Sequence, residues 1–237
     1  MKIALIGYGK MGKVIDRLAI DKGHEIVLRI NERVQANNEA LLKADVAIEF
    51  STPESAAANI YACFEAGIPV VVGTTGWYDQ FPNIEDQCKA NNHTLFYATN
   101  FSVGVNIFFE LNRYLSRMMN RFDNYTPKML EIHHTEKLDA PSGTAITLAE
   151  DLIYEMDRLK GWKNEEVWDD DRLSILSERK PDVPGTHRVE YESAIDSIAI
   201  RHEAKGREGF ASGAIAAAEW VAGKQGVFTM KDLLKIQ

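Results

Sequence analysis

Two histidines and a lysine, the residues best suited to chemistry, lie close together in the segment 131–145, EIHHTEKLDAPSGTA. His133 and Lys137 are four residues apart, a spacing that can bring two side chains to one side of a turn. A histidine titrates near neutral pH and can give or take a proton, whereas a lysine can donate a proton or hold an anion. The segment therefore predicts proton transfer beside a bound anion.

The same segment ends in a helix start. Ser142 is suited to cap a helix over 143–158, and the free N–H groups of Ser142–Thr144 can hold a carboxylate. Each feature alone has an ordinary structural explanation. A lone histidine is more often structural, a loop lysine is usually solvated, and Pro-Ser-Gly-Thr can be only a helix start. The clustering of these residues favours a functional site.

A glycine-rich loop follows directly after a short apolar strand at 2–6. The loop has the form G-x-G-x-x-G and consists of Gly7, Tyr8, Gly9, Lys10, Met11 and Gly12. Gly7 allows a tight turn, Gly9 lets the backbone approach a pyrophosphate, and Gly12 lets the next helix pack close to the strand. The N–H groups at the helix start would hold the phosphates. The loop predicts a dinucleotide site, and the alternative is a structural turn without a nucleotide.

An acidic residue stands where such a site needs one. Glu32 lies about twenty residues beyond Gly12, at the end of a predicted strand over 25–30, where an acid binds the ribose of adenosine. Arg33 follows it and can meet a 2′-phosphate. The pair leaves the choice between NADH and NADPH open.

The elements that must position these residues alternate in the first half of the chain. Strands are predicted at 2–6, 25–30, 45–50, 68–72 and 94–98, and helices at 11–22, 52–66 and 84–91. Strands separated by helices indicate a parallel sheet covered on both faces. The loops 51–53, 73–76 and 99–102 then face one crevice, although each is also explained by ordinary turn chemistry.

The second half predicts a mixed domain. Helices are expected at 105–120, 143–158, 212–222 and 230–236, strands at 128–133, 188–192 and 197–202, and the segment 162–184 has no assignment. The fold class is therefore α/β. A Rossmann-type dinucleotide-binding domain comprises residues 1–102 and 212–237, and an α+β domain for substrate binding and oligomerisation comprises 103–211. The last helices would return to cover the first sheet.

Composition narrows the function classes. The chain has 237 residues, of which 45% are hydrophobic and 26% charged, as in soluble globular proteins. A net charge of -8 disfavours nucleic acid as a partner, and an anionic substrate needs a local basic pocket. Cys63 and Cys88 form no CxxC pair, so no zinc or redox motif is seen. With no apolar run of about 18 residues and no signal peptide pattern, a cytoplasmic location without membrane contact is expected.

Several blocks resemble one enzyme family. The pattern E-x-H-H-x-x-K-x-D-A-P-S-G-T-A at 131–145 is similar to the signature of dihydrodipicolinate reductases. Residues 98–106, ATNFSVGVN, resemble that family's A-x-N-F-S-x-G-V-N segment, which meets the nicotinamide. The blocks at 50–54, 73–76 and 210–214 also match, so the resemblance runs from Lys2 to about Ala218.

The resemblance implies an activity. The family reduces the ring of 4-hydroxy-tetrahydrodipicolinate, a small heterocyclic dicarboxylate, to tetrahydrodipicolinate in lysine and diaminopimelate biosynthesis. Water leaves and C4 takes a hydride from NADH or NADPH, and no metal is needed. His133 would be the proton donor and acceptor, and Lys137 the second proton donor. The typical assembly is a homotetramer.

The resemblance also implies binding roles. The substrate would be bound by His134, Ser142, Gly143 and Thr144. The dinucleotide would be bound by Gly7–Gly12, Glu32, Arg33, Gly73, Thr74, Thr75, Ala98, Thr99, Asn100 and Phe101.

Two departures and two alternatives stand beside this interpretation. The glycine loop is one residue shorter than the G-x-x-G-x-M-G of many relatives, and residues 161–190 are short and lack the Arg-Gly-Gly of the family, which bears on subunit contacts. A different nicotinamide oxidoreductase, such as an amino-acid or sugar dehydrogenase, could share the first half. A non-catalytic sensor would bind NADH without oxidising it. The His133–Lys137 block argues against both.

Overall fold

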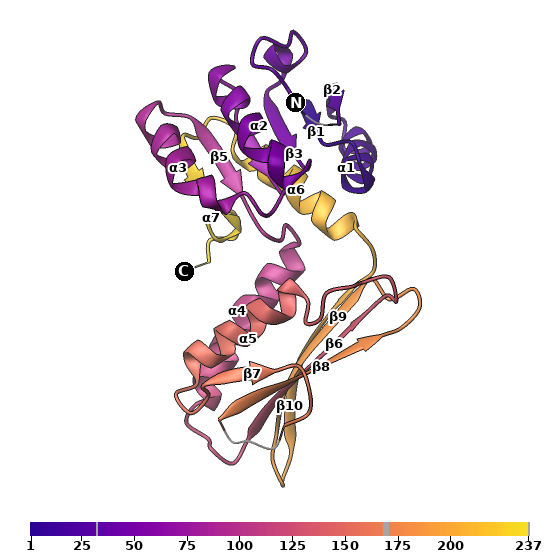
Figure 1. Ribbon diagram of the computed structural model, residues 1–237, viewed down its shortest axis with the longest axis vertical. Coiled ribbons are helices and arrows are strands. Elements are labelled where there is room, and N and C mark those ends of the chain that lie inside the picture. The colour runs from indigo at the N-terminus through magenta and orange to yellow at the C-terminus, as the bar shows by residue number, and fades with distance from the viewer. Residues whose placement is uncertain (32, 168–170, 237) are drawn as a thin grey trace. The chain divides into compact units, whose positions relative to one another are not determined.

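The chain folds into two compact units. A computed structural model describes residues 1–31, 33–167 and 171–236, so the predicted ribose ligand Glu32 lies outside the described residues. Unit 1 comprises Met1–Val103 and Arg207–Gln237, and unit 2 comprises Gly104–Gly206 (Figure 1). Helix α6 (Glu208–Trp220) belongs wholly to unit 1, so the boundary expected before Ser212 falls inside a helix.

Unit 1 is built on a six-stranded parallel sheet with the order β11-β5-β4-β3-β1-β2. Its strands are β1 (Lys2–Ile6), β2 (Glu25–Ile30), β3 (Val46–Glu49), β4 (Val70–Val72), β5 (Thr94–Tyr97) and β11 (Gly226–Phe228). The five strands predicted in the first half of the chain are all present. The chain adds β2 on one side of β1 and then β3, β4 and β5 on the other side, so the strand order reverses between β1 and β3. At such a point the loops that follow neighbouring parallel strands form a crevice.

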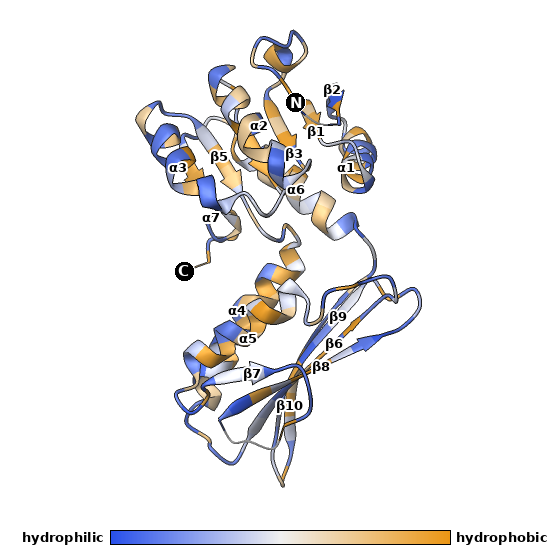
Figure 2. Cartoon of the chain, viewed as in Figure 1, coloured by the Kyte–Doolittle hydropathy of each residue, from blue (hydrophilic) through white to orange (hydrophobic). Residues whose placement is uncertain are grey.

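Helices cover both faces of this sheet, as predicted. They are α1 (Lys10–Asp21), α2 (Pro53–Glu65), α3 (Phe81–Ala90), α6 and α7 (Met230–Leu234), with short 3-10 turns at Leu41–Lys43 and Tyr78–Gln80. Alternate residues of β1 point to opposite sides: Ala4 and Ile6 pack with α2 and α3, whereas Ile3 and Leu5 pack with α1 and α6. Figure 2 accordingly shows β1 and β3 as predominantly hydrophobic. The returning α6 closes the second face.

Unit 2 pairs two helices with one face of a mixed sheet. Its elements are α4 (Val103–Met119), β6 (Thr126–His133), α5 (Gly143–Glu155), β7 (Gly161–Lys163), β8 (Arg172–Arg179), β9 (Gly185–Glu192) and β10 (Ser197–Ala204), in the sheet order β10-β9-β6-β8-β7. Alternate residues such as Met129, Ile175 and Tyr191 pack against α4 and α5. Strand β8 lies in the segment that had no assignment, and it pairs in parallel with β6.

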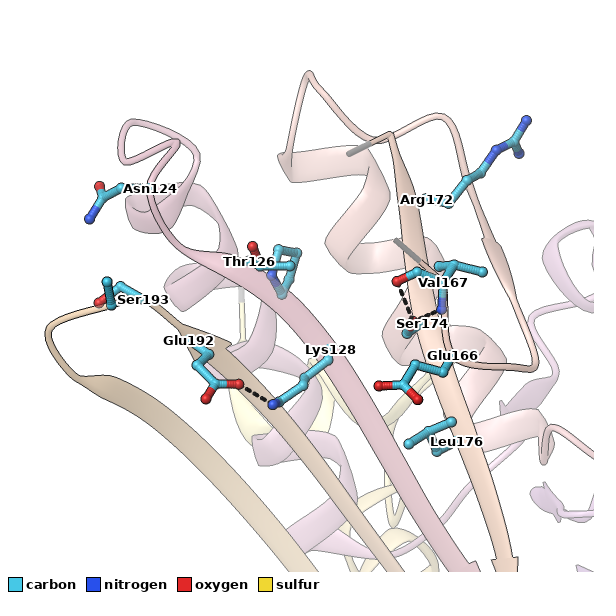
Figure 3. Close-up of a pocket in the computed structure, with 12 residues that line it drawn as sticks. Asn124, Thr126, Lys128, Glu166, Val167, Arg172, Ser174, Leu176, Glu192 and Ser193 are labelled. Carbon is cyan, nitrogen blue, oxygen red and sulfur yellow. Dashed lines mark hydrogen bonds and ion pairs between the residues drawn. The ribbon is translucent and has the colours of Figure 1, made fainter. Parts of the chain in front are cut away.

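The other face of the unit 2 sheet carries a pocket of about 540 Å³ (Figure 3). Lys128 and Glu192 form an ion pair within it, and Ser174 and Leu176 of β8 also line it. Of the described residues that line this pocket, none belongs to the predicted site. Among the described helices of both units, none is long and apolar enough to cross a membrane.

Candidate active site

The glycine loop of unit 1 is fixed by close backbone contacts. Gly7 has a φ of 96°, its N–H donates to Ile30 O at 2.7 Å, and an added Cβ would lie 2.0 Å from Phe50 O. A Cβ on Gly12 would lie 2.1 Å from Gly7 O. A Cβ on Gly9 meets nothing within 4 Å among the described residues. Gly7 and Gly12 are therefore required by packing, whereas Gly9 leaves open space in front of the loop.

This open space lies at the N-terminus of α1. Gly9 and Lys10 are exposed, and the first turn of α1, all of it described, holds no acidic side chain. Free N–H groups and the helix dipole make such an end a site for phosphate. The cradle that a side chain at position 9 would fill therefore fits a dinucleotide, and Gly7–Gly12 is the segment that would hold its pyrophosphate.

Side chains anchor the loop from behind. The Tyr8 hydroxyl donates to Asp16, and Asp16 accepts from Arg29 Nε at 2.7 Å and Nη2 at 2.9 Å. The hydrogen bonds from Arg29 lower the pKa of Asp16 against the opposing effect of burial. Tyr8 is thus bound to strand β2 through Asp16, which holds the glycine loop in place before any ligand arrives.

A buried acid at the end of β3 organises the neighbouring loop. Glu49 accepts hydrogen bonds from the Ser51 N–H at 3.1 Å and from Asn59 Nδ2 at 3.3 Å, and the Ser51 hydroxyl also donates to it. Asn59 Oδ1 accepts from Val34 N at 3.0 Å. Burial raises the pKa of Glu49, although these hydrogen bonds oppose the shift. Sequence reasoning missed Glu49, whose one signal is a charge ending an apolar strand.

The remaining loop residues of unit 1 divide into buried and accessible ones. Gly73 packs on the Phe50 ring, where a Cβ would lie 2.1 Å from a ring carbon, and Phe101 is only 2% exposed. Thr74 and Ala98 are buried, Asn100 is half-buried, and Arg33, Thr75 and Thr99 are exposed. The Phe101 side chain belongs to the core, so only its backbone can face a coenzyme.

In unit 2, the centre of the predicted catalytic site is the buried carboxylate of Glu131. Its Oε2 lies 3.3 Å from His133 Nε2 and 3.6 Å from His187 Nε2. The geometry follows from the sheet, because Glu131 and His133 point to one face of β6, and His187 is the cross-strand partner of Glu131 on β9. A Cβ on Gly185 would lie 3.0 Å from His133 Cε1, so this glycine leaves room for the imidazole.

Hydrogen bonds hold Glu131 in its ionised form. The Ser142 N–H lies 3.1 Å from each carboxylate oxygen, and the Ser177 hydroxyl donates to Oε1 at 2.8 Å. Burial opposes ionisation, but these bonds and those from His133 and His187 outweigh it and lower the pKa of Glu131. Burial lowers the pKa of His187, although Glu131 opposes that shift. Both pKa shifts favour an ionised Glu131 beside an uncharged His187.

Lys137 lies in the turn after β6. Its Nζ contacts both carboxylate oxygens of Asp139 at 2.8 Å. The backbone N–H of Lys137 donates to His134 O at 3.2 Å. Arg179 of β8 ties this turn down, since its Nε donates to Lys137 O at 3.2 Å and its Nη2 to Asp139 O at 2.6 Å. Sequence reasoning assigned no role in the site to His187 or Arg179.

Three of the four predicted substrate ligands, Ser142, Gly143 and Thr144, lie at the start of α5. Ser142 is the N-cap, as predicted, and its Oγ accepts from Ala145 N at 3.2 Å. Gly143 is exposed and Thr144 is half-buried. The Nδ1 atom of His134 is buried and has no hydrogen-bond partner among the described residues. Such an atom costs stability unless a ligand or water satisfies it, so it points to a ligand at this place.

Replacing Glu131 with glutamine is expected to lower the free energy of unfolding by about 1–3 kcal/mol at pH 7, because an ionised hydrogen-bond acceptor is lost. The folded-state pKa of Glu131 lies below its ordinary value of 4.5. Its contribution is therefore complete above that value and is lost as the pH falls through the folded pKa. Urea denaturation between pH 3.5 and 8 measures this. A difference between wild type and variant that grows toward acid would contradict the assignment.

Replacing Arg179 with alanine is expected to lower kcat about tenfold, because the turn that carries Lys137 loses two of its tethers. Arg179→Lys should recover little, since an ammonium cannot reach two carbonyls in the geometry of a guanidinium. Steady-state rates report the loss, and the Kd for NADH serves as the control. Full activity in Arg179→Ala would show that the turn keeps its conformation without the hydrogen bonds from Arg179.

Comparisons with known proteins agree along the whole chain. Two family models match it: "Dihydrodipicolinate reductase, N-terminus" over residues 1–101 and "Dihydrodipicolinate reductase, C-terminus" over residues 104–234. A protein named 4-hydroxy-tetrahydrodipicolinate reductase from Christiangramia forsetii is 48% identical over 99% of this chain and 98% of its own length. A protein of the same name from Archaeoglobus fulgidus is 33% identical over 99% of this chain and 100% of its own length.

Solved structures share the fold. A dipicolinate-bound dihydrodipicolinate reductase from Paenisporosarcina sp. TG-14 superposes with a TM-score of 0.76 at 22% identity and covers 97% of both chains. A scyllo-inositol dehydrogenase from Lactobacillus casei has a TM-score of 0.57 at 9% identity and covers 99% of this chain and 92% of its own. At these identities the likeness shows the architecture alone.

Proposed function

Because the chain belongs to the dihydrodipicolinate reductase family, we propose that His133 and Lys137 supply the protons of its reaction while a nicotinamide coenzyme supplies the hydride. The reaction is the NAD(P)H-dependent reduction of 4-hydroxy-tetrahydrodipicolinate to tetrahydrodipicolinate in lysine and diaminopimelate biosynthesis. The proposal for the residues is carried by the buried Glu131 carboxylate, 3.3 Å from His133 Nε2.

His133 is suited to proton transfer by its neighbours. A protonated imidazole at this position has its charge stabilised by the ionised Glu131, and Glu131 itself is held by Ser142 and Ser177. His133 can thus give a proton as the substrate's hydroxyl leaves as water, and take one back afterwards. Lys137 stands in the adjoining turn as the second donor, and Asp139 keeps its ammonium group in place.

The substrate's two carboxylates need positive partners in an acidic protein of net charge -8. The groups suited to this are the Nδ1 of His134, which has no partner among the described residues, the N–H groups of Gly143 and Thr144, and the Lys137 ammonium. Ser142 would act through its place at the N-cap of α5. Together these groups would form the local basic site that an anionic substrate needs.

The coenzyme, when bound, delivers a hydride to ring carbon C4. We propose that Gly7–Gly12 binds its pyrophosphate and that Gly73, Thr74, Thr75, Ala98, Thr99, Asn100 and the backbone of Phe101 line the rest of its site. Unit 1, which includes all of α6, would form the coenzyme domain, and unit 2 the substrate domain.

Glu32→Ala is expected to weaken the binding of NADH more than that of NADPH, because a carboxylate binds the free ribose hydroxyl and repels a 2′-phosphate. The opposite change is expected for Arg33→Ala, whose wild-type side chain is exposed. Fluorescence titration of each variant with both coenzymes gives the four Kd ratios. An unchanged preference in Glu32→Ala would remove Glu32 from the ribose site.

The function is tested by coupling the purified protein to a dihydrodipicolinate synthase reaction and following NAD(P)H absorbance. Steady oxidation that needs the synthase product supports the reductase. Binding of NADH without oxidation would support a sensor, and turnover of amino acids or sugars in a substrate panel would support another dehydrogenase. A homotetramer in the cytoplasm remains expected, and light scattering of the purified protein tests the assembly.

A further inference from the structure

Three metal-ligating atoms converge in unit 2. Glu131 Oε2 lies 3.3 Å from His133 Nε2 and 3.6 Å from His187 Nε2, and the two imidazole nitrogens are 3.4 Å apart. All three residues are buried. They are also the one group of His, Cys, Asp and Glu side chains with this geometry in the part of the chain that the structure describes.

This cluster holds more polar atoms than the hydrogen bonds of one ring nitrogen can serve. A ring nitrogen carries one proton or one lone pair in the ring plane, so it makes one good hydrogen bond. His187 Nε2 nevertheless has three polar neighbours: Glu131 Oε2, His133 Nε2, and Ser142 Oγ at 3.1 Å. An ion placed among these atoms would accept the lone pairs of both nitrogens and of the carboxylate at once.

The spacing suits a particular ion. In a tetrahedral zinc site with ligands at about 2.0–2.1 Å, neighbouring ligands lie about 3.3–3.4 Å apart. The three separations here are 3.3, 3.4 and 3.6 Å. Two histidines and one glutamate also form a known zinc ligand set, which leaves a fourth position for water or, here, the Ser142 hydroxyl.

We propose that Glu131, His133 and His187 bind Zn²⁺ or a similar divalent transition metal, and that the bound ion inhibits the reductase. Inhibition follows because a metal bound at Nε2 takes the place of the proton there, so that His133 can no longer form the imidazolium that Glu131 would stabilise. This consequence rests on the role proposed for His133, whereas the binding site does not. The positive charge of Arg179 opposes the ion, and the Glu131 carboxylate, whose Oε1 lies 3.8 Å from Arg179 Nη1, offsets that repulsion.

The binding test uses the full-length protein after treatment with EDTA. Zn²⁺ is titrated by calorimetry, and Co²⁺ by its visible absorption, which is intense for a tetrahedral site. We expect one ion per chain and a tetrahedral Co²⁺ spectrum. His187→Gln should weaken binding by more than the 10–100-fold typical of an outer-sphere partner. His93→Gln is the matched control, because His93 lies in unit 1 and stacks on Phe64.

The activity test adds Zn²⁺ to the coupled assay. NADH oxidation by wild type and His93→Gln should fall with bound zinc and recover with EDTA. The His187→Gln variant should keep its own rate of NADH oxidation, whatever that rate is, at zinc concentrations that abolish the activity of the wild type. Equal zinc affinity in His187→Gln and wild type would overturn the site. If the protein had no reductase activity, the calorimetry and the Co²⁺ spectrum would still decide whether it binds.

Discussion

Replacing Lys137 with alanine is expected to lower kcat by about 10²–10⁴-fold, the usual contribution of a positioned proton donor. The Kd for NADH should change little, because the turn that carries Lys137 belongs to unit 2 and the glycine loop belongs to unit 1. Rates of NADH oxidation and a fluorescence titration with NADH measure the two quantities separately. Partial rescue by added small amines would show that an ammonium group is what the variant lacks.

Lys160→Ala is the matched control for this experiment. Lys160 is an exposed lysine of the same unit, and its backbone N–H donates to Asp171 O. Its loss should leave kcat close to that of the wild type. Equal losses of turnover and NADH affinity in Lys137→Ala would mean that the lysine serves the coenzyme rather than the proton transfer.

Two glycines of the same loop are expected to fail in different ways when each becomes alanine. In Gly12→Ala the new Cβ would lie 2.1 Å from Gly7 O, a backbone atom that cannot move aside, so stability should fall by about 1–3 kcal/mol or more. NADH binding should be lost with it. In Gly9→Ala the Cβ meets no described atom within 4 Å. The fold should therefore persist while the methyl group blocks the pyrophosphate.

Urea denaturation and a fluorescence titration with NADH separate these outcomes. Gly9→Ala should keep the wild-type midpoint of unfolding and lose about tenfold or more in NADH affinity, about 1.4 kcal/mol. Wild-type NADH affinity in Gly9→Ala would show that no phosphate lies against this glycine. A stable Gly12→Ala that binds NADH would show that the loop is more plastic than its contacts indicate.

Local patterns were sufficient for much of the fold. Gly7–Gly12 follows a strand and precedes a helix as predicted, and Ser142 caps α5, because a turn and a cap depend on residues close in sequence. Strand β8 was missed because its charged and polar residues obscure the alternation of Leu173 and Ile175, which face α4 and α5. The three-residue β11 is too short to show a period, and its partner β5 is far away in sequence.

The site was predictable only in part, for the same reason. His133, His134, Lys137 and Ser142 lie in one segment and could be found together. His187 reaches them through the pairing of β9 with β6, and Arg179 through the pairing of β8 with β6. Register between distant strands is set by tertiary packing, so no spacing in the sequence shows it.

The division of unit 1 into Met1–Val103 and Arg207–Gln237 has a consequence for biosynthesis. While the ribosome makes unit 2, the nascent nucleotide-binding sheet has neither its edge strand β11 nor α6, which packs on Val71 and Phe96. That apolar face stays exposed until Arg207–Gln237 has been synthesised, whereas unit 2 emerges as one uninterrupted stretch. Unit 2 can therefore fold before unit 1, and chaperones would meet Met1–Val103 as a segment whose sheet is still incomplete.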